Sequence, residues 1–130
     1  VLCNFRYNLQ GKIRWINRKA GPGDILFSVH MNSYINSKAS GSEVWYESFD
    51  PDSKIKAVRM AYVLHETLGL PNRGTFGDRD NRHGRLAIIR DTIPQAFLLE
   101  MGFISNKEDV EKVREFGVSA IVDSVKSVLK

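Results

Sequence analysis

The sequence contains one cysteine, Cys3, among its 130 residues. A single thiol excludes an internal disulfide framework and any zinc site built from several cysteines. No apolar run approaches the roughly 20 residues that a membrane-spanning helix requires, so we expect no such helix in this chain. The first residues, VLCNFRYN, show neither an initiator methionine nor a signal-peptide pattern. We therefore expect either a removed leader or a piece of a longer protein.

Composition and charge are ordinary for a globular domain, since 42% of the residues are apolar and 26% are charged. The length predicts one domain with a core large enough to do without disulfides. The 19 basic and 15 acidic residues leave a net charge of +4. This mild excess fits a polyanionic partner such as nucleic acid or an anionic cell wall, and it fits equally a protein without such a partner.

Hydrophobic spacing predicts three helices. Apolar residues share one face over 9–20, and the GPG that follows ends this helix. A second helix opens at DPDS (50–53) and ends at GLP (69–71). A C-terminal helix follows SNKE (105–108), which matches a capping box, and Gly117 is a candidate interruption within it.

Four short apolar runs predict strands, and the polar segments beside them predict loops. The strands are expected at 24–30, 43–49, 86–90 and 96–100, and the loops at 31–42 and 72–85. Helices and buried strands in this order indicate an α/β fold, with an open, twisted, mainly parallel sheet flanked by helices.

Two polar residues close predicted strands. His30 ends DILFSVH, and Glu100 ends AFLLE. Because sites in parallel sheets form beyond the carboxyl ends of the strands, these two residues are candidates for one site. For His30, a structural role and a role as metal ligand or general base are both open. His65, at the border of an apolar stripe, is interpreted as structural, and His83 as a solvated loop residue.

Glu100 is a carboxylate among apolar residues, where an unpaired charge is costly. One interpretation is an ion pair with Arg90 on the neighbouring apolar run. The other is a general base whose pKa is raised by burial towards neutrality. Sequence patterns alone favour neither of the two.

Familiar catalytic and nucleotide-binding motifs are missing, among them HExxH, paired cysteines, a nucleophile elbow and a phosphate loop. The basic loop at 73–90 suits an anionic polymer, but Asp78, Asp80 and Asp91 dilute its charge. Aromatic residues for base stacking are nearly absent there. Nucleic acid is therefore the weaker prediction for a partner.

Four stretches stand in an order that is typical of one enzyme family. They are RWINRKAGPGDILFSVHMNSY, GSEVWYE, LPNRG and LAIIRDTIPQAFLLEMGFISNKED, which together span most of the chain. The sequence resembles the zinc-dependent N-acetylmuramoyl-L-alanine amidases of the amidase-3 type, found in bacterial autolysins and phage endolysins. The last stretch is the longest and most specific match.

The resemblance implies roles for four residues. His30 would be a zinc ligand, and Glu100 would be the base that takes a proton from zinc-activated water and passes it to the departing nitrogen. Asn32 and Arg90 would bind or orient the substrate. The bond cleaved would be the amide between N-acetylmuramic acid and L-alanine of the peptidoglycan stem peptide. Such a protein would act at the cell wall or outside the cell, or stay in the cytoplasm until lysis if it were a phage endolysin.

The sequence departs from the family at the remaining zinc ligands. The family usually has a further histidine and a glutamate before the matched region, yet no histidine, aspartate or glutamate precedes Asp24. His65 and His83 match no ligand position. We therefore expect residues 1–130 to form one amidase catalytic domain, incomplete at its N-terminus and missing the family's first strand–helix unit. Weak zinc binding, little activity and an exposed sheet edge would follow.

Two other interpretations compete with an enzyme. One is a non-catalytic peptidoglycan-binding module with a degenerate amidase fold. The other is a nucleotide- or nucleic-acid-binding α/β domain, which strongly salt-dependent DNA binding without binding to cell wall would favour. The sequence makes no prediction of oligomeric state.

Overall fold

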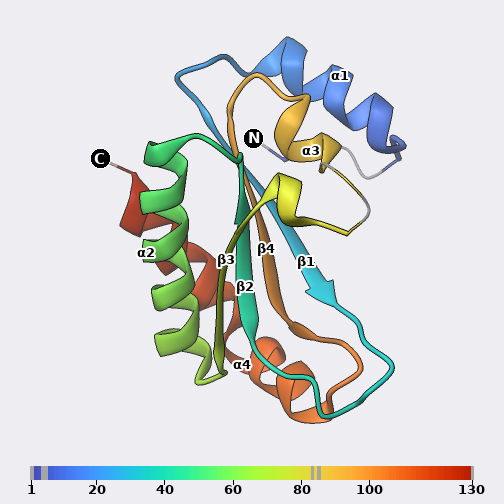
Figure 1. The fold of residues 1–130 in the computed structure, drawn as a ribbon, viewed down its shortest axis with the longest axis vertical. Helices are drawn as coiled ribbons and strands as arrows, with labels where there is room; N and C mark the ends of the chain where they lie inside the picture. The colour runs from blue at the N-terminus through green and yellow to red at the C-terminus, as the bar shows by residue number, and fades with distance from the viewer. Residues whose placement is uncertain (1, 4–5, 83, 85, 130) are drawn as a thin grey trace.

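The computed structural model describes residues 2–3, 6–82, 84 and 86–129. Its centre is a four-stranded sheet with the spatial order β1-β4-β2-β3 (Figure 1). The strands are β1 (Ile25–Asn32), β2 (Ser42–Tyr46), β3 (Asn72–Gly77) and β4 (Gln95–Phe103). The β1–β4 and β2–β3 pairs are parallel, whereas β2 and β4 run antiparallel. The predicted α/β fold with an open sheet is confirmed, and parallel pairs prevail in it.

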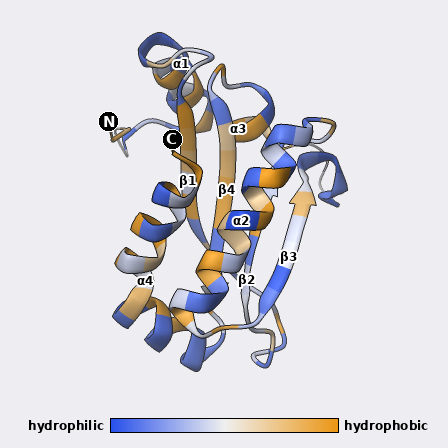
Figure 2. Ribbon diagram, turned by 90° about the vertical axis from the view of Figure 1, so that its left-hand side faces the viewer, coloured by the Kyte–Doolittle hydropathy of each residue, from blue (hydrophilic) through white to orange (hydrophobic). Residues whose placement is uncertain are grey.

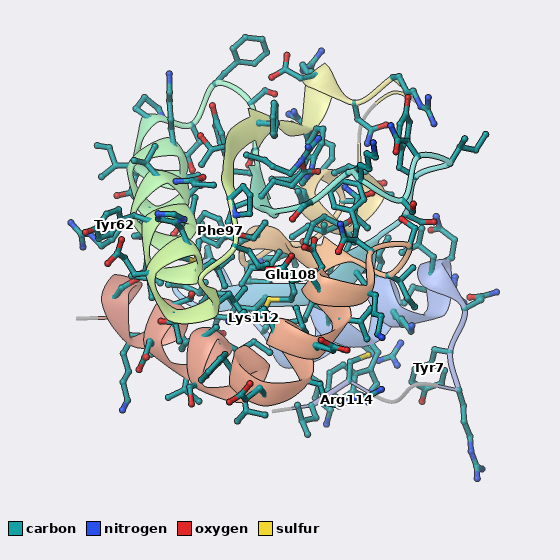
Figure 3. All side chains as sticks on the ribbon, turned by 90° about the horizontal axis from the view of Figure 1, so that it is seen from below. Tyr7, Tyr62, Phe97, Glu108, Lys112 and Arg114 are labelled. Atoms are coloured by element: carbon teal, nitrogen blue, oxygen red, sulfur yellow. The ribbon has the colours of Figure 1, made fainter. Side chains whose placement is uncertain are left out.

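Two long helices, α2 (Pro51–Leu68) and α4 (Lys107–Val128), cover one face of the sheet (Figures 1 and 2). The main apolar core lies between them and the strands, where Met60, Leu64, Phe97 and Leu99 are fully buried. Figure 3 shows Phe97 among interior side chains, whereas Tyr62 on α2 points outward. Among the described residues, no helix is long and apolar enough to span a membrane.

Two shorter helices, α1 (Leu9–Lys19) and α3 (Ala87–Arg90), lie together at one end of the sheet, at the top of Figure 1. Asn17 of α1 joins them, since its side chain donates to the carbonyl of Asp91 and accepts from the amide of Ile93. Ile89 of α3 packs in a second, smaller core on the sheet face opposite α2 and α4. The rest of that face is left for polar side chains.

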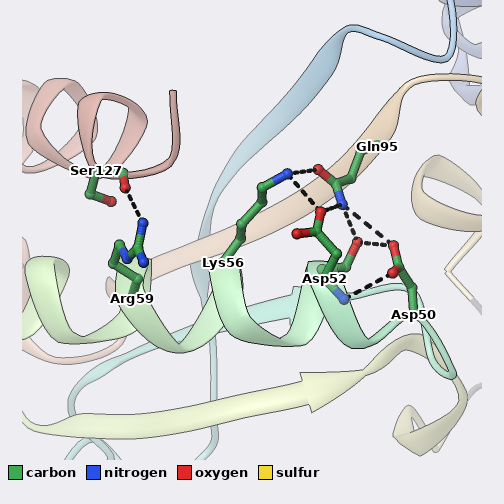
Figure 4. A network of polar contacts seen from close by, with 7 residues as sticks. Asp50, Asp52, Lys56, Arg59, Gln95 and Ser127 are labelled. Carbon is green, nitrogen blue, oxygen red and sulfur yellow. Dashed lines mark hydrogen bonds and ion pairs between the residues drawn. The ribbon is translucent and has the colours of Figure 1, made fainter. Parts of the chain in front are cut away.

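Polar contacts fix the start of α2 against the start of β4 (Figure 4). Gln95, the first residue of β4, donates to Asp52 and Ser53 in the first turn of α2 and accepts from Lys56. Lys56 also forms an ion pair with Asp52 at 2.7 Å. A helix N-terminus favours nearby carboxylates, so this network stabilises α2. The same contacts fix the start of β4 against this helix.

Two predicted elements are wrong. Residues 86–90 were expected to form a strand, but 87–90 form the short helix α3. A five-residue apolar run cannot distinguish the two by periodicity. The predicted loop at 72–85 includes the strand β3 and the 3-10 helix η1 (Asp78–Asp80). β3 is an edge strand paired with β2 alone, and edge strands tolerate the polar residues that suggested a loop.

The predicted capping box is also wrong in its register. The N-cap of α4 is Asn106, whose side chain accepts from the amide of Asp109, and not Ser105. Ser105 accepts instead from the amide of Tyr34. The helix runs without a break through Gly117, which is buried.

Asp109 ties the start of α4 to two other segments. Its carboxylate is fully buried and accepts from the amides of Gly41 (3.0 Å) and Phe103 (2.8 Å) and from the Ser40 hydroxyl. Buried carboxylates of this kind are stable only when such donors satisfy them. Asp109 therefore fixes the segment before β2 against the end of β4.

Replacing this carboxylate tests its structural role. We expect Asp109→Ala to lower the free energy of unfolding by about 2 to 4 kcal/mol, because three donors lose their charged acceptor. Asp123, exposed on the same helix, provides the matched control, and Asp123→Ala should change stability by less than about 0.5 kcal/mol. Urea denaturation measures both. Equal losses in the two variants would contradict the role given to Asp109.

Candidate active site

One row of side chains crosses the polar face of the sheet. His30 of β1 is the register partner of Glu100 on β4, and Glu100 is in turn the partner of Glu43 on β2. Register partners on adjacent strands project to the same face. The row continues to β3, where Arg73 forms an ion pair with Glu43 at 2.9 Å. Each of the four strands thus contributes one ionisable side chain.

The two predicted residues do not lie beyond the ends of their strands. His30 and Glu100 are each followed by further strand residues, and they project from the face of the sheet. The expected association of His30 with Glu100 is present, at adjacent positions in the β1–β4 register. β2 and β3 run antiparallel to β1 and β4. The first residues of β2 therefore lie opposite residues near the C-terminal end of β4.

Two β-bulges shape this face. β4 has one more residue than β1 between the His30–Glu100 pair and the Asn32–Phe103 pair. An extra residue reverses the alternation of side chains, and this turns Phe103 to the polar face. β3 has a similar insertion at Gly74, whose φ of 99° suits glycine.

A cavity of about 550 Å³ opens over three members of this row, and His30 is not among its lining residues. Its lining includes Asn32, Glu43, Arg73, Glu100 and Phe103, and residues of the loop after η1 also reach it. Polar groups in a concave site of this size are typical of ligand-binding or catalytic pockets. The cavity thus contains two of the four residues singled out by the sequence, Glu100 and Asn32.

Glu43 is the buried carboxylate of the row and is only 5% exposed. Its Oε2 accepts from Arg73 Nε, and its Oε1 accepts from Trp45 Nε1 (3.0 Å) and Asn32 Nδ2 (3.2 Å). Three donors, one of them cationic, satisfy a carboxylate that would otherwise be expensive to bury. Glu43 is therefore a well-compensated anion beside Glu100.

Glu100 has no comparable compensation. Its Oε2 is buried without a hydrogen-bond partner in the described part of the chain. Burial, and then the negative charge of Glu43, raise the pKa of Glu100 to about 7. A carboxyl group with this pKa exchanges protons readily at neutral pH, as a general base or acid must. The alternative of an ion pair with Arg90 is wrong.

Arg90 is engaged elsewhere. Its guanidinium donates to both carboxylate oxygens of Asp78 and to Glu47, and only 16% of its side chain is exposed. Although burial alone would raise the pKa of Asp78, the hydrogen bonds and charge of Arg90 lower it. This geometry favours a structural role that connects α3 with η1, and the substrate contact of Arg90 stays a prediction.

His30 lies on β1, which is an edge of the four-stranded sheet. The residue as a whole is exposed, and its Nε2 is 2.7 Å from the Ser28 hydroxyl. Partial burial of the ring, and then the charge of Lys12, lower the pKa of His30, so that the imidazole is neutral at pH 7. A neutral imidazole is the form that binds metals.

The other two histidines have different surroundings. His65 donates from Nδ1 to the carbonyl of Leu70 at 2.6 Å, which agrees with the structural interpretation. His83 lies outside the described residues.

Glu43 and Arg73 were missed as site residues. Both belong to stretches that carried the family resemblance, GSEVWYE and LPNRG, but neither received a role. A glutamate within the apolar run EVWY is a signal of the same kind as Glu100. A rule that flags every carboxylate in a predicted strand would have found Glu43.

The side chains described here do not fit a zinc site by themselves. Among them, no group of three or more histidine, cysteine, aspartate or glutamate residues is arranged to hold a metal ion. Catalytic zinc usually has three protein ligands. The row offers the imidazole of His30, while the nearby Glu43 carboxylate is occupied by Arg73.

Comparison with known proteins identifies the family of the chain. The family model described as N-acetylmuramoyl-L-alanine amidase matches residues 6–126. The chain belongs to this amidase family. It is 33% identical over 93 residues to the probable cell wall amidase LytH of Staphylococcus saprophyticus, an alignment that covers 72% of this chain and 29% of LytH.

Solved structures of similar proteins share the fold. The catalytic domain of the CD27L endolysin targeting Clostridia difficile is 32% identical, with a TM-score of 0.71 over 90% of this chain and 58% of that one. Cwp6 from Clostridium difficile is 26% identical, with a TM-score of 0.78 over 95% of this chain and 20% of that one. This chain therefore spans little more than half of the CD27L domain, and less of the longer relatives.

The raised pKa of Glu100 predicts how stability depends on pH. The folded state holds its proton up to about pH 7, whereas the ordinary value is 4.5. The favourable contribution of the protonated form is thus complete below about pH 4.5 and is lost as the pH rises through 7. Glu100→Gln should match the wild type in stability at pH 5 and exceed it at pH 8 by roughly 1 to 2 kcal/mol, after allowance for solvent screening.

Denaturant unfolding at both pH values measures this difference, and Glu115→Gln on the exposed side of α4 is the control. The control should show no pH-dependent gain. If the difference in stability between Glu100→Gln and the wild type were the same at pH 5 and pH 8, burial would not be raising the pKa of Glu100.

Proposed function

We propose that this chain is the core of a peptidoglycan amidase that hydrolyses the amide between N-acetylmuramic acid and L-alanine of the stem peptide. One observation carries the proposal: Glu100 projects into the cavity with an unpaired, buried oxygen and a pKa of about 7. Family membership and the cell wall amidases among its relatives support the choice of substrate. The site of action would be the cell wall.

In this proposal Glu100 is the general base. Its carboxylate takes a proton from a water molecule as the water oxygen attacks the amide carbonyl carbon. The protonated Glu100 then returns that proton to the alanine nitrogen, and the C–N bond breaks as the carboxylic acid and the free amine form. At neutral pH both protonation states of Glu100 are populated, so one residue serves both steps.

Asn32 would help to orient these groups. Its Nδ2 donates to Glu43, and it lies on the cavity wall together with Glu100. Arg90, bound to Asp78, is the less supported of the two predicted substrate contacts.

We infer that the zinc implied by the family needs ligands from outside residues 1–130. The side chains described here supply one neutral imidazole, His30, on an edge strand. This inference is supported by the alignments, in which the chain covers only 58% of the CD27L catalytic domain and 20% of Cwp6. Residues that lie beside the open edge of β1 in a longer protein could complete the ligand set.

Restoring the upstream sequence provides the test. In a protein extended to the full amidase domain, we expect zinc-dependent release of free L-alanine amino termini from purified peptidoglycan. Glu100→Gln should lower the rate at least about 100-fold, since removal of a general base costs 10² to 10⁴. The 130-residue chain alone should bind zinc weakly and release little alanine.

The outcomes separate the two candidate functions. Full activity of Glu100→Gln would show that Glu100 is not the base. A non-catalytic wall-binding module is the second candidate, favoured by the lack of a complete metal-ligand group among the described residues. It would replace the enzyme if the extended protein bound cell wall without ever releasing alanine termini.

A further inference from the structure

We propose that the guanidinium of Arg73 forms a carboxylate-binding subsite, which recognises an acidic residue of the peptide next to the bond that is cleaved. The inference rests on the proposed function in one respect, because it gives the same cavity a preference within its substrate class. It is carried by the geometry of Arg73 and by the charges that surround it.

The backbone presents Arg73 to the cavity. Asn72 pairs with Ser42, and after the Gly74 bulge Thr75 pairs with Val44. Arg73 lies opposite Glu43 and lines the cavity. The bulge requires a positive φ at Gly74, which is 99° and which glycine adopts without steric cost. The amide of Gly74 donates to the Asn72 side chain at 2.8 Å.

The guanidinium plane is held in place from two sides. Nε donates to Glu43 Oε2 at 2.9 Å, and the guanidinium carbon lies 4.9 Å from the centre of the Phe103 ring. Both contacts restrict the rotation of a long side chain, so binding a ligand costs less conformational entropy. Glu43 is itself fixed by Trp45 and Asn32.

The two terminal amino groups of Arg73 are left for a ligand. Within the described residues they make no hydrogen bond, and 40% of the side chain is exposed. The parallel N–H groups of a guanidinium fit the two oxygens of a carboxylate. Arg82 also lines the cavity, but it already has an interaction within the protein.

The surrounding charges favour a carboxylate over a phosphate. Glu43 and Asp80 both line the cavity, and Arg73 is already neutralised in part by Glu43. A dianionic phosphate would be repelled by this set more strongly than a singly charged carboxylate. The residue recognised should therefore be an acidic amino acid of the peptide.

The test uses two soluble peptides that differ in one group. Both carry a lactyl-alanyl unit, followed by glutamate in one and by glutamine in the other. Their affinities for the 130-residue chain are measured by calorimetric titration, which does not depend on turnover. We expect the glutamate peptide to bind about tenfold more tightly, as one charge-assisted hydrogen-bonded pair would give.

Variants assign this preference to Arg73. Arg73→Gln should abolish the preference for the glutamate peptide. Arg73→Lys should reduce it to about threefold or less, because lysine keeps the cation beside Glu43 but lacks the two parallel N–H groups of a guanidinium. If Arg73→Gln fails to fold because the buried Glu43 loses its cationic partner, the lysine variant decides. Arg14→Gln, an equal change of charge at an exposed position of α1, should leave the preference unchanged.

Several results would overturn the subsite. They are equal binding of the two peptides, no binding of either, a preference that survives in both Arg73 variants, or inorganic phosphate that binds as tightly as the glutamate peptide. The proposed function fails separately. If the preference is found but an extended protein releases no alanine termini, the subsite stands without that reaction.

Discussion

The site depends on two carboxylates placed side by side on neighbouring strands, with one cation that pairs with only one of them. Glu43 and Glu100 are register partners, and Arg73 pairs with Glu43. Like charges opposite each other on a sheet are unfavourable, and burial increases that cost. The protein resolves the conflict unequally. Glu43 accepts hydrogen bonds from Arg73 and from two neutral donors. Glu100 has no such partners, and its pKa is raised to about 7.

The order of the strands makes this conflict possible. β4 lies in the interior of the sheet, parallel to β1 and antiparallel to β2, so Glu100 has a neighbour on each side (Figure 1). α2 and α4 fill one face with apolar contacts, and the small core around α3 closes only part of the other. The bulges then turn Phe103 and Arg73 towards the open part. Scaffold and site are consequences of the same topology.

The sequence predicted what depends on local pattern and missed what depends on pairing. The runs around His30 and Glu100 are apolar enough to reveal strands, and the long helices follow from their spacing. β3 was missed because an edge strand needs few apolar residues. Glu43 received no role because its importance comes from lying opposite Glu100 in an antiparallel pair, and no local pattern specifies that β2 pairs with β4. For the same reason Arg90 was offered as the partner of Glu100, although its partners are Asp78 and Glu47.

Burial beside Glu43 raises the pKa of Glu100 to about 7, so that both protonation states are populated at neutral pH, and this is the central claim. The most direct measurement is a carbon-13 NMR titration of the Glu100 side-chain carboxyl in the folded chain, assigned by its loss in Glu100→Gln. The account predicts a midpoint near the pKa of about 7, well above the ordinary 4.5. A midpoint close to 4.5 would contradict it, because Glu100 would then be an ordinary solvated carboxylate.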